Sequence, residues 1–208
     1  MLIKTSSLAR LLKQKDMTSD DILTLFWERD GHIFSLLPRE CFVECRWEDL
    51  PTTSYAVMSY QWKSLWHTLV DFILHSDGRV LEDFMWIDAF CLNQMLTDKI
   101  KTIRRSDEIY SNAKAYHLME IGALSRGWVL FELSSVPEAL IPPKIHLSTQ
   151  DHGLIEMAKL SLSRDGFNGC RFKEESDREI VQGKIVDRYG SIDEFNLRII
   201  AIVNRIFV

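Results

Sequence analysis

The chain has 208 residues, of which 46% are hydrophobic, and this is enough material for one globular domain with its own core. Its formal net charge of −5 argues against a general nucleic-acid-binding protein, because such proteins need a basic surface. No stretch approaches the roughly 18 consecutive apolar residues of a membrane span, and the amino-terminal segment lacks a secretory core, so we expect a cytoplasmic protein without membrane contact.

The amino-terminal part of the chain is predicted to be a helical extension followed by a connector. A short leucine stripe at helical spacing begins at Leu8, and a second stripe covers residues 22–27. Residues 34–50 show no clear period. We therefore divide the chain into an extension, residues 1–50, and one compact domain, residues 51–208.

The domain alternates short apolar strands with amphipathic helices. Strands are predicted at residues 55–60, 84–87, 115–119 and 144–148. Helices are predicted at residues 66–74, 98–115 and 125–135, and three more helices end the chain, the last two with caps at Ser176 and Ser191. This alternation predicts an α/β fold, with a central, mostly parallel sheet and helices on both of its faces.

Neither a disulfide framework nor a metal site is expected. The four cysteines form no repeated pair, and Cys41 and Cys45 have no histidine at zinc spacing. The six histidines are scattered along the chain. We predict no bound metal and reduced thiols, with Cys91 acting as a small core side chain.

Polar side chains follow the first two predicted strands of the domain. Tyr60 ends the first strand and Gln61 and Trp62 follow it, while Asp88 and Asn93 come after the second strand. Because the carboxyl ends of parallel strands meet at one edge of a sheet, these side chains can share a ligand-binding crevice. The alternative is that Asp88 and Asn93 only cap the following helix.

Glu132 is the most unusual titratable residue, because the helix turn around it is otherwise apolar. A carboxylate in such a place must reach solvent, find a partner or line a cleft, since a buried unpaired charge is costly. A desolvated glutamate has a raised pKa, which prepares it for catalysis. The alternative is that Glu132 occupies the narrow solvent-facing side of a buried helix. Trp128 is similarly open to two interpretations, as a core residue or as a platform for a heterocycle.

Four sequence blocks resemble the heterokaryon-incompatibility (HET) domain, a branch of the Toll/interleukin-1 receptor (TIR) superfamily. The blocks lie at residues 55–62, 84–94, 109–113 and 126–132, and their order is that of the family. The most specific of them is Trp-Ile-Asp-x-x-Cys-x-Asn-Gln in the second block. The resemblance implies a flavodoxin-like TIR fold, here with helical additions at both ends of the chain.

The resemblance also implies an activity. Catalytic TIR domains cleave the nicotinamide–ribose bond of NAD, and their functional glutamate lies four residues after a tryptophan, as Glu132 lies after Trp128. NAD is then the substrate rather than a cofactor, and self-association into a homo-oligomer switches on the enzyme in immunity or cell death. Glu132 is the expected catalytic residue. The side chains expected to bind the substrate are those of Tyr60, Gln61, Trp62, Asp88, Asn93 and Trp128.

Two other functions stay open at this point. The first is a non-catalytic module that signals by assembling with other TIR-like domains. The second is a hydrolase or transferase that acts on another nucleotide or nucleoside in the same crevice. The short segment before Trp128 and the aromatic corner at Gln61 and Trp62 depart from many TIR domains, so the resemblance leaves the substrate open.

Overall fold

The structure is a computed structural model. It describes residues 1–14, 39–61, 83–91, 103–141, 144–145 and 152–207. The helix predicted at residues 66–74 and the apolar stripe at residues 22–27 lie outside the described residues, as do two of the predicted substrate-binding residues, Trp62 and Asn93.

The described residues form a mixed α/β structure around one six-stranded sheet with the strand order β2-β1-β4-β3-β5-β6. Its strands are β1 (Leu2–Lys4), β2 (Phe42–Val43), β3 (Ala56–Ser59), β4 (Phe84–Trp86), β5 (Ala115–Leu118) and β6 (Lys144–Ile145). The pairs β3–β4, β3–β5 and β5–β6 are parallel. β1 pairs antiparallel with both β2 and β4, so β1 and β2 form an antiparallel edge beside the parallel strands.

Strands β3, β4, β5 and β6 confirm the four strands predicted from the apolar runs. β1 and β2 were not expected, because residues 1–50 were predicted to hold only helices and a connector. Ile3 of β1 pairs with Met85 of β4, and both side chains are fully buried. The amino-terminal segment therefore belongs to the same sheet as the domain, and the predicted boundary at residue 50 cuts through that sheet.

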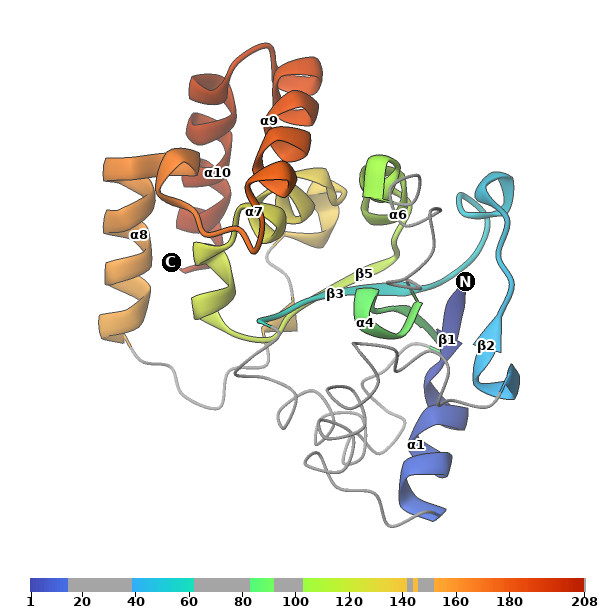
Figure 1. The fold of residues 1–208 in the computed structure, drawn as a ribbon. Coiled ribbons are helices and arrows are strands. Elements are labelled where there is room, and N and C mark those ends of the chain that lie inside the picture. The colour runs from blue at the N-terminus through green and yellow to red at the C-terminus, as the bar shows by residue number, and fades with distance from the viewer. Residues whose placement is uncertain (15–38, 62–82, 92–102, 142–143, 146–151, 208) are drawn as a thin grey trace.

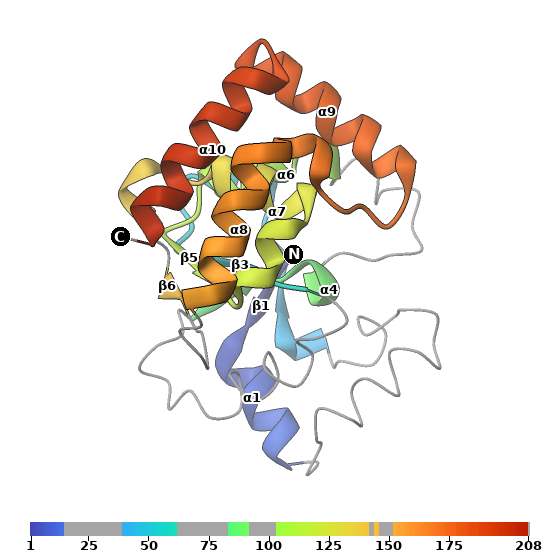
Figure 2. The ribbon, with the colours of Figure 1, turned by 90° about the vertical axis from the view of Figure 1, so that its left-hand side faces the viewer.

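Seven α-helices and five short 3-10 helices are found in the described parts of the chain. The α-helices are α1 (Thr5–Gln14), α4 (Asp88–Cys91), α6 (Ser106–Ser111), α7 (Gly127–Ser135), α8 (His152–Asp165), α9 (Glu175–Tyr189) and α10 (Ile192–Ile206). The 3-10 helices are η2 (Arg39–Cys41), η3 (Trp47–Asp49), η4 (Ile121–Ser125), η5 (Glu138–Leu140) and η6 (Gly166–Gly169). Figures 1 and 2 show α6, α7, α9 and α10 on one side of the sheet and α1 on the opposite side.

The carboxyl-terminal helices follow their sequence signals closely, apart from one cap. The predicted apolar face of α10 is buried, with Phe195, Ile199, Ile202 and Val203 all at most 5% exposed. Ser191 caps α10 as predicted, since its hydroxyl accepts a hydrogen bond from the backbone N–H of Glu194 at 3.1 Å. The cap predicted at Ser176 was wrong, because α9 begins one residue before that serine and has no side-chain cap.

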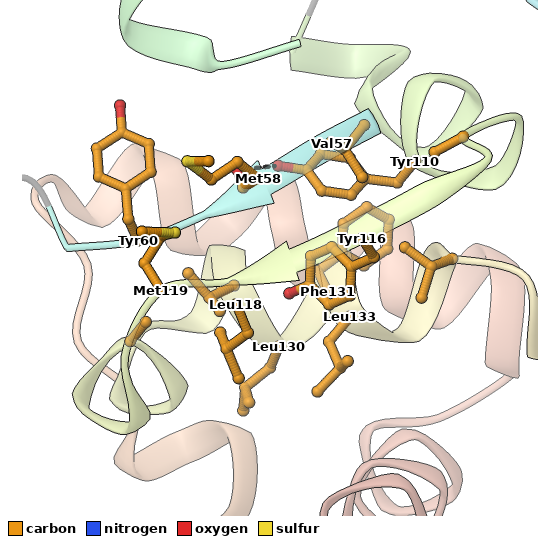
Figure 3. Close-up of a cluster of buried hydrophobic side chains, with 14 of the residues drawn as sticks. Val57, Met58, Tyr60, Tyr110, Tyr116, Leu118, Met119, Leu130, Phe131 and Leu133 are labelled. Atoms are coloured by element: carbon orange, nitrogen blue, oxygen red, sulfur yellow. Dashed lines mark hydrogen bonds between the residues drawn. The ribbon is translucent and has the colours of Figure 1, made fainter. Parts of the chain in front are cut away.

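Side chains alternate between the two faces of the sheet along β3, and this alternation determines which of them contact the helices. Successive residues of a strand point to opposite faces, so Tyr55, Val57 and Ser59 share one face. The hydroxyl of Tyr55 donates to the backbone oxygen of Ile109 in α6 at 2.6 Å, which identifies this face as the one covered by α6 and α7. In β5 the same face carries Tyr116, which pairs with Val57 in the sheet register. The core on this side, shown in Figure 3, holds the candidate site.

Candidate functional site

Strand β3 delivers a buried serine to the glutamate of α7. Ser59 is the last residue of β3 and is 1% exposed. Its hydroxyl donates a hydrogen bond to Oε2 of Glu132 at 2.5 Å, across 73 residues of sequence. A hydrogen bond to a carboxyl oxygen limits the rotation of the side chain. Glu132 is therefore fixed at the carboxyl end of β3.

The pKa of Glu132 is raised to about 8, chiefly because its carboxyl group is desolvated by burial. Glu132 as a whole is half-buried. The negative charge of Asp88 also raises this pKa, whereas the hydrogen bond from Ser59, the charge of Arg126 and a hydrogen bond with Tyr110 lower it. Glu132 is consequently mainly protonated at neutral pH, and the direction of its pKa shift is the one expected for a desolvated glutamate.

Two buried tyrosines adjoin the glutamate. The ring of Tyr110 makes edge contacts with Trp86 at 5.7 Å and with Tyr116 at 6.2 Å. The hydroxyl of Tyr110 donates to the backbone oxygen of Met58 at 3.3 Å, the dashed line in Figure 3. The hydroxyl of Tyr116 has no hydrogen-bond partner among the described residues. Burial and the charge of Glu132 raise the pKa of both phenols, so both stay protonated.

A second polar pair lies beside the first. The hydroxyl of Tyr60 donates to Oδ1 of Asp88 at 2.6 Å, and Nη1 of Arg126 donates to the backbone oxygen of Tyr60 at 3.2 Å. Figure 3 shows the Tyr60 side chain pointing away from Tyr110 and Tyr116. Asp88 is the first residue of α4, which therefore begins one residue earlier than a helix capped by Asp88 would. Its carboxylate is nevertheless bound by a side chain from the end of β3, so Asp88 also joins two strand ends.

The remaining predicted residues lie at the margin of this cluster. The side-chain amide of Gln61 packs over η4, where its Nε2 lies 2.9 Å from the point that a Cβ on Gly122 would occupy. Trp128 is partly buried and packs against the core, one helical turn before Glu132 and on the same face of α7. The structure thus brings together Glu132, Tyr60 and Asp88 from the predicted set.

Sequence reasoning missed most of the groups that surround the glutamate. Tyr110, Tyr116 and Arg126 were given no role, and Ser59 appeared only as a residue of the first predicted strand. The available signal was a serine at the end of a fully buried apolar strand, since a buried hydroxyl normally needs a hydrogen-bond partner. The tyrosines gave no signal, because their position depends on sheet register and helix packing.

The described residues contain no group of three or more histidine, cysteine or acidic side chains that could hold a metal ion. They also contain no helix with the length and hydropathy needed to cross a membrane. The four cysteines are free thiols, and Cys91 is a core residue with a pKa raised to about 11 by burial. The described part of the chain offers carboxyl and hydroxyl groups for chemistry at this site.

The comparison with protein families concerns the segment that carries the strand ends of the site. Residues 46–124 match the family model of the heterokaryon incompatibility protein (HET). No curated protein and no solved structure matches the chain. The match confirms the HET resemblance over these residues.

The matched segment, residues 46–124, contains β3, β4 and β5, and with them Ser59, Tyr60 and Asp88. Trp128 and Glu132 lie just beyond its end, on α7. The site is therefore assembled from strand ends inside the matched segment and from α7, which follows that segment.

Proposed function

We propose that this protein is a TIR-like NAD glycohydrolase that acts in cell-death signalling, with Glu132 as its catalytic residue. The observation that carries the proposal is the desolvated carboxyl of Glu132, which the hydrogen bond from Ser59 fixes at the carboxyl end of β3. A carboxyl group at such a strand end lies where open α/β sheets bind their ligands.

The order of the parallel strands supports a flavodoxin-like arrangement. Taken in chain order, β3, β4, β5 and β6 are the first to fourth parallel strands, and their order in the sheet is second, first, third, fourth. Flavodoxin-like sheets begin in this way and bind their ligands where the first and third strands meet. Here that place lies between β3 and β5, where Ser59 and Tyr116 adjoin Glu132.

The proposed reaction needs one well-placed carboxylate. The bond between the anomeric carbon of the ribose and the nicotinamide nitrogen breaks, and nicotinamide leaves as a neutral molecule with the electron pair of that bond. Water then adds to the anomeric carbon and loses a proton, which gives ADP-ribose. An ionised Glu132 would stabilise the oxocarbenium-like transition state and hold the ribose hydroxyls. An adenine nitrogen of the same substrate is the alternative acceptor and would give a cyclic product.

The raised pKa of Glu132 fits this chemistry if substrate binding promotes its ionisation. The nicotinamide ring of NAD carries a positive charge, and a positive charge near a carboxyl favours the carboxylate. Gln61, Trp62 and Trp128 would contact the nicotinamide side of the substrate. Tyr60 is only 3% exposed and is hydrogen-bonded to Asp88, so Tyr60, Asp88 and Asn93 would order the crevice. NAD is thus the substrate, and the proposed reaction requires no cofactor.

The proposal is tested by incubating the purified protein with NAD, NADP, ATP and nucleosides and separating the products by chromatography. Because self-association is proposed to activate the enzyme, the assay is run at high protein concentration and with the protein clustered by a fused oligomer. We expect nicotinamide and ADP-ribose, or its cyclic form, from NAD. Consumption of another nucleotide in place of NAD would instead support the alternative of a hydrolase or transferase that acts on that nucleotide.

A non-catalytic assembly module is the second candidate function, and the surface of α8 favours it. The helix lies at the left edge of the molecule in Figure 1 and in front of the sheet in Figure 2, and it exposes Leu154, Met157 and Leu160 by 46%, 59% and 68%. Apolar side chains gathered on one helix are typical of an interaction surface. This candidate predicts no loss of NAD at any degree of clustering, and loss of association when Met157 and Leu160 are both changed to glutamate.

A further inference from the structure

The hydroxyl groups of Ser59 and Tyr116 lie near Glu132 and are too deeply buried to contact a substrate. Ser59 and Tyr116 are each 1% exposed. Ser59 is therefore unsuited to be a nucleophile, although its hydroxyl is hydrogen-bonded to a carboxyl group. Any effect of these two hydroxyls on a reaction must pass through Glu132.

The hydroxyl of Tyr116 is the unusual member of the pair. Buried side-chain hydroxyls in folded proteins are hydrogen-bonded in the large majority of cases. By geometry, the Tyr116 hydroxyl has no such partner among the described residues. The charge of Glu132 raises its pKa and a weak hydrogen-bonding interaction with Ser59 lowers it, so both groups lie near it. When the carboxyl group of Glu132 loses its proton, the resulting carboxylate is a strong hydrogen-bond acceptor for the Tyr116 hydroxyl.

We propose that Ser59 and Tyr116 are positioning residues for Glu132, with Ser59 holding Oε2 in place and Tyr116 donating a second hydrogen bond to the ionised carboxylate. The inference rests on the proposed function, in which an ionised Glu132 faces the ribose. Glu132 and its two hydroxyl neighbours then have two states. In the first, Glu132 is protonated and Tyr116 has no acceptor; in the second, the carboxylate accepts hydrogen bonds from both hydroxyls.

Other groups around Glu132 also act on its ionisation. The charge of Asp88 in α4 opposes it, and the charge of Arg126 before α7 favours it. Tyr110 of α6 favours it as well, but its hydroxyl already donates to the backbone oxygen of Met58. α9 presents two cations to α7, and both are engaged elsewhere. Lys184 forms an ion pair with an aspartate of α6, and Arg188 donates to the serine that ends α7.

The test measures the ionisation of Glu132 directly. The protein is labelled with glutamate carrying 13C at the side-chain carboxyl, and the Glu132 signal is the one that Glu132→Gln removes. Its chemical shift is followed against pH in the wild type, in Tyr116→Phe and in Ser59→Ala. Each variant removes a donor that the carboxylate uses, so we expect the midpoint to rise by about one pH unit in each.

Two variants serve as matched controls. Tyr55→Phe removes the hydroxyl of another fully buried tyrosine on the same sheet face, but one that donates to a backbone oxygen in α6. It should leave the midpoint of Glu132 unchanged. Ser59→Thr keeps the hydroxyl and should restore most of the shift that Ser59→Ala produces. If Ser59→Ala fails to fold, Tyr116→Phe alone decides, because it keeps the ring and removes only a hydroxyl without a partner.

A midpoint in Tyr116→Phe within about 0.3 pH units of the wild type, or an equal shift in Tyr55→Phe, would overturn the inference. The test does not depend on turnover. A protein that cleaves no NAD would refute the proposed function, while the Glu132 midpoints would still decide the roles of Ser59 and Tyr116. In a protein that cleaves NAD, the pH profile of kcat/KM should move with the midpoint.

Discussion

At the scale of single residues, the protonation of Glu132 is the central property of the site. Its pKa of about 8 lies far above the ordinary value of 4.5, and the largest cause is burial. A carboxyl group whose pKa is raised by folding stabilises the folded state when protonated, and this contribution is lost as the pH rises toward the folded pKa. Glu132 therefore links the stability of the fold to the chemistry proposed for it.

The first prediction concerns stability. Between pH 5 and pH 9 the free energy of unfolding of the wild type should fall, relative to that of Glu132→Gln, by on the order of 3 kcal/mol. Glutamine is never ionised, so it avoids the cost of burying a charge. Urea unfolding of both proteins at several pH values measures the difference. A difference that stays constant over this range would show that Glu132 ionises as an ordinary surface glutamate.

The second prediction concerns activity. If an ionised Glu132 is needed for cleavage, kcat/KM for NAD should rise with pH to a plateau, with a midpoint near 8 set by the free enzyme. The midpoint of kcat should lie lower, because the positive nicotinamide ring favours the carboxylate in the complex. Initial rates of nicotinamide release over this pH range provide the measurement. Activity that falls as the pH rises through this range would contradict the requirement for a carboxylate.

At the scale of secondary-structure elements, the strands inside the domain and the carboxyl-terminal helices were predictable, because each carries a local signal. The buried stripe of α10 and the runs that form β3 and β5 are of this kind. β1 and β2 were not predictable, because strands of three and two residues show no period. They exist through pairing with each other and with β4, which lies far along the sequence.

The third prediction compares two glycines in and after α9. Gly190 ends the helix with φ of 80°, a conformation that costs alanine about 1 kcal/mol. Gly183 lies inside the helix with no atom within 4 Å of an added Cβ, so alanine should raise stability there by about 0.5–1 kcal/mol. Thermal unfolding of Gly190→Ala and Gly183→Ala should therefore shift in opposite directions. Equal shifts of the same sign would contradict the assigned end of α9.

At the scale of the whole molecule, the sheet unites segments that the sequence separates. The amino-terminal strand extends the sheet on one side of β4, while β3 on the other side of β4 leads to the site. The site itself joins residues as far apart as Ser59 and Glu132. Sequence reasoning could single out Glu132 because a carboxylate breaks an apolar helix turn, but its hydroxyl partners depend on long-range packing, which local patterns do not encode.

The fourth prediction tests whether the amino-terminal strand is part of the folded unit. Ile3 is fully buried between β2 and β4, so Ile3→Ala should lower the free energy of unfolding by about 2–4 kcal/mol in a single transition. Leu160→Ala on the exposed surface of α8 should change it by less than about 0.5 kcal/mol. Chemical denaturation of both variants provides the comparison. An unchanged stability for Ile3→Ala would mean that the first strand folds separately.

The measurement that tests the central claim most directly is the release of nicotinamide from NAD by the clustered protein and by two glutamine variants. Glu132→Gln keeps the size of the side chain and removes its charge, whereas Glu138→Gln alters an exposed glutamate that is paired with Arg205. We predict that the wild type and Glu138→Gln release nicotinamide at similar rates and that Glu132→Gln is at least about 100-fold slower. Undiminished release by Glu132→Gln would contradict the account.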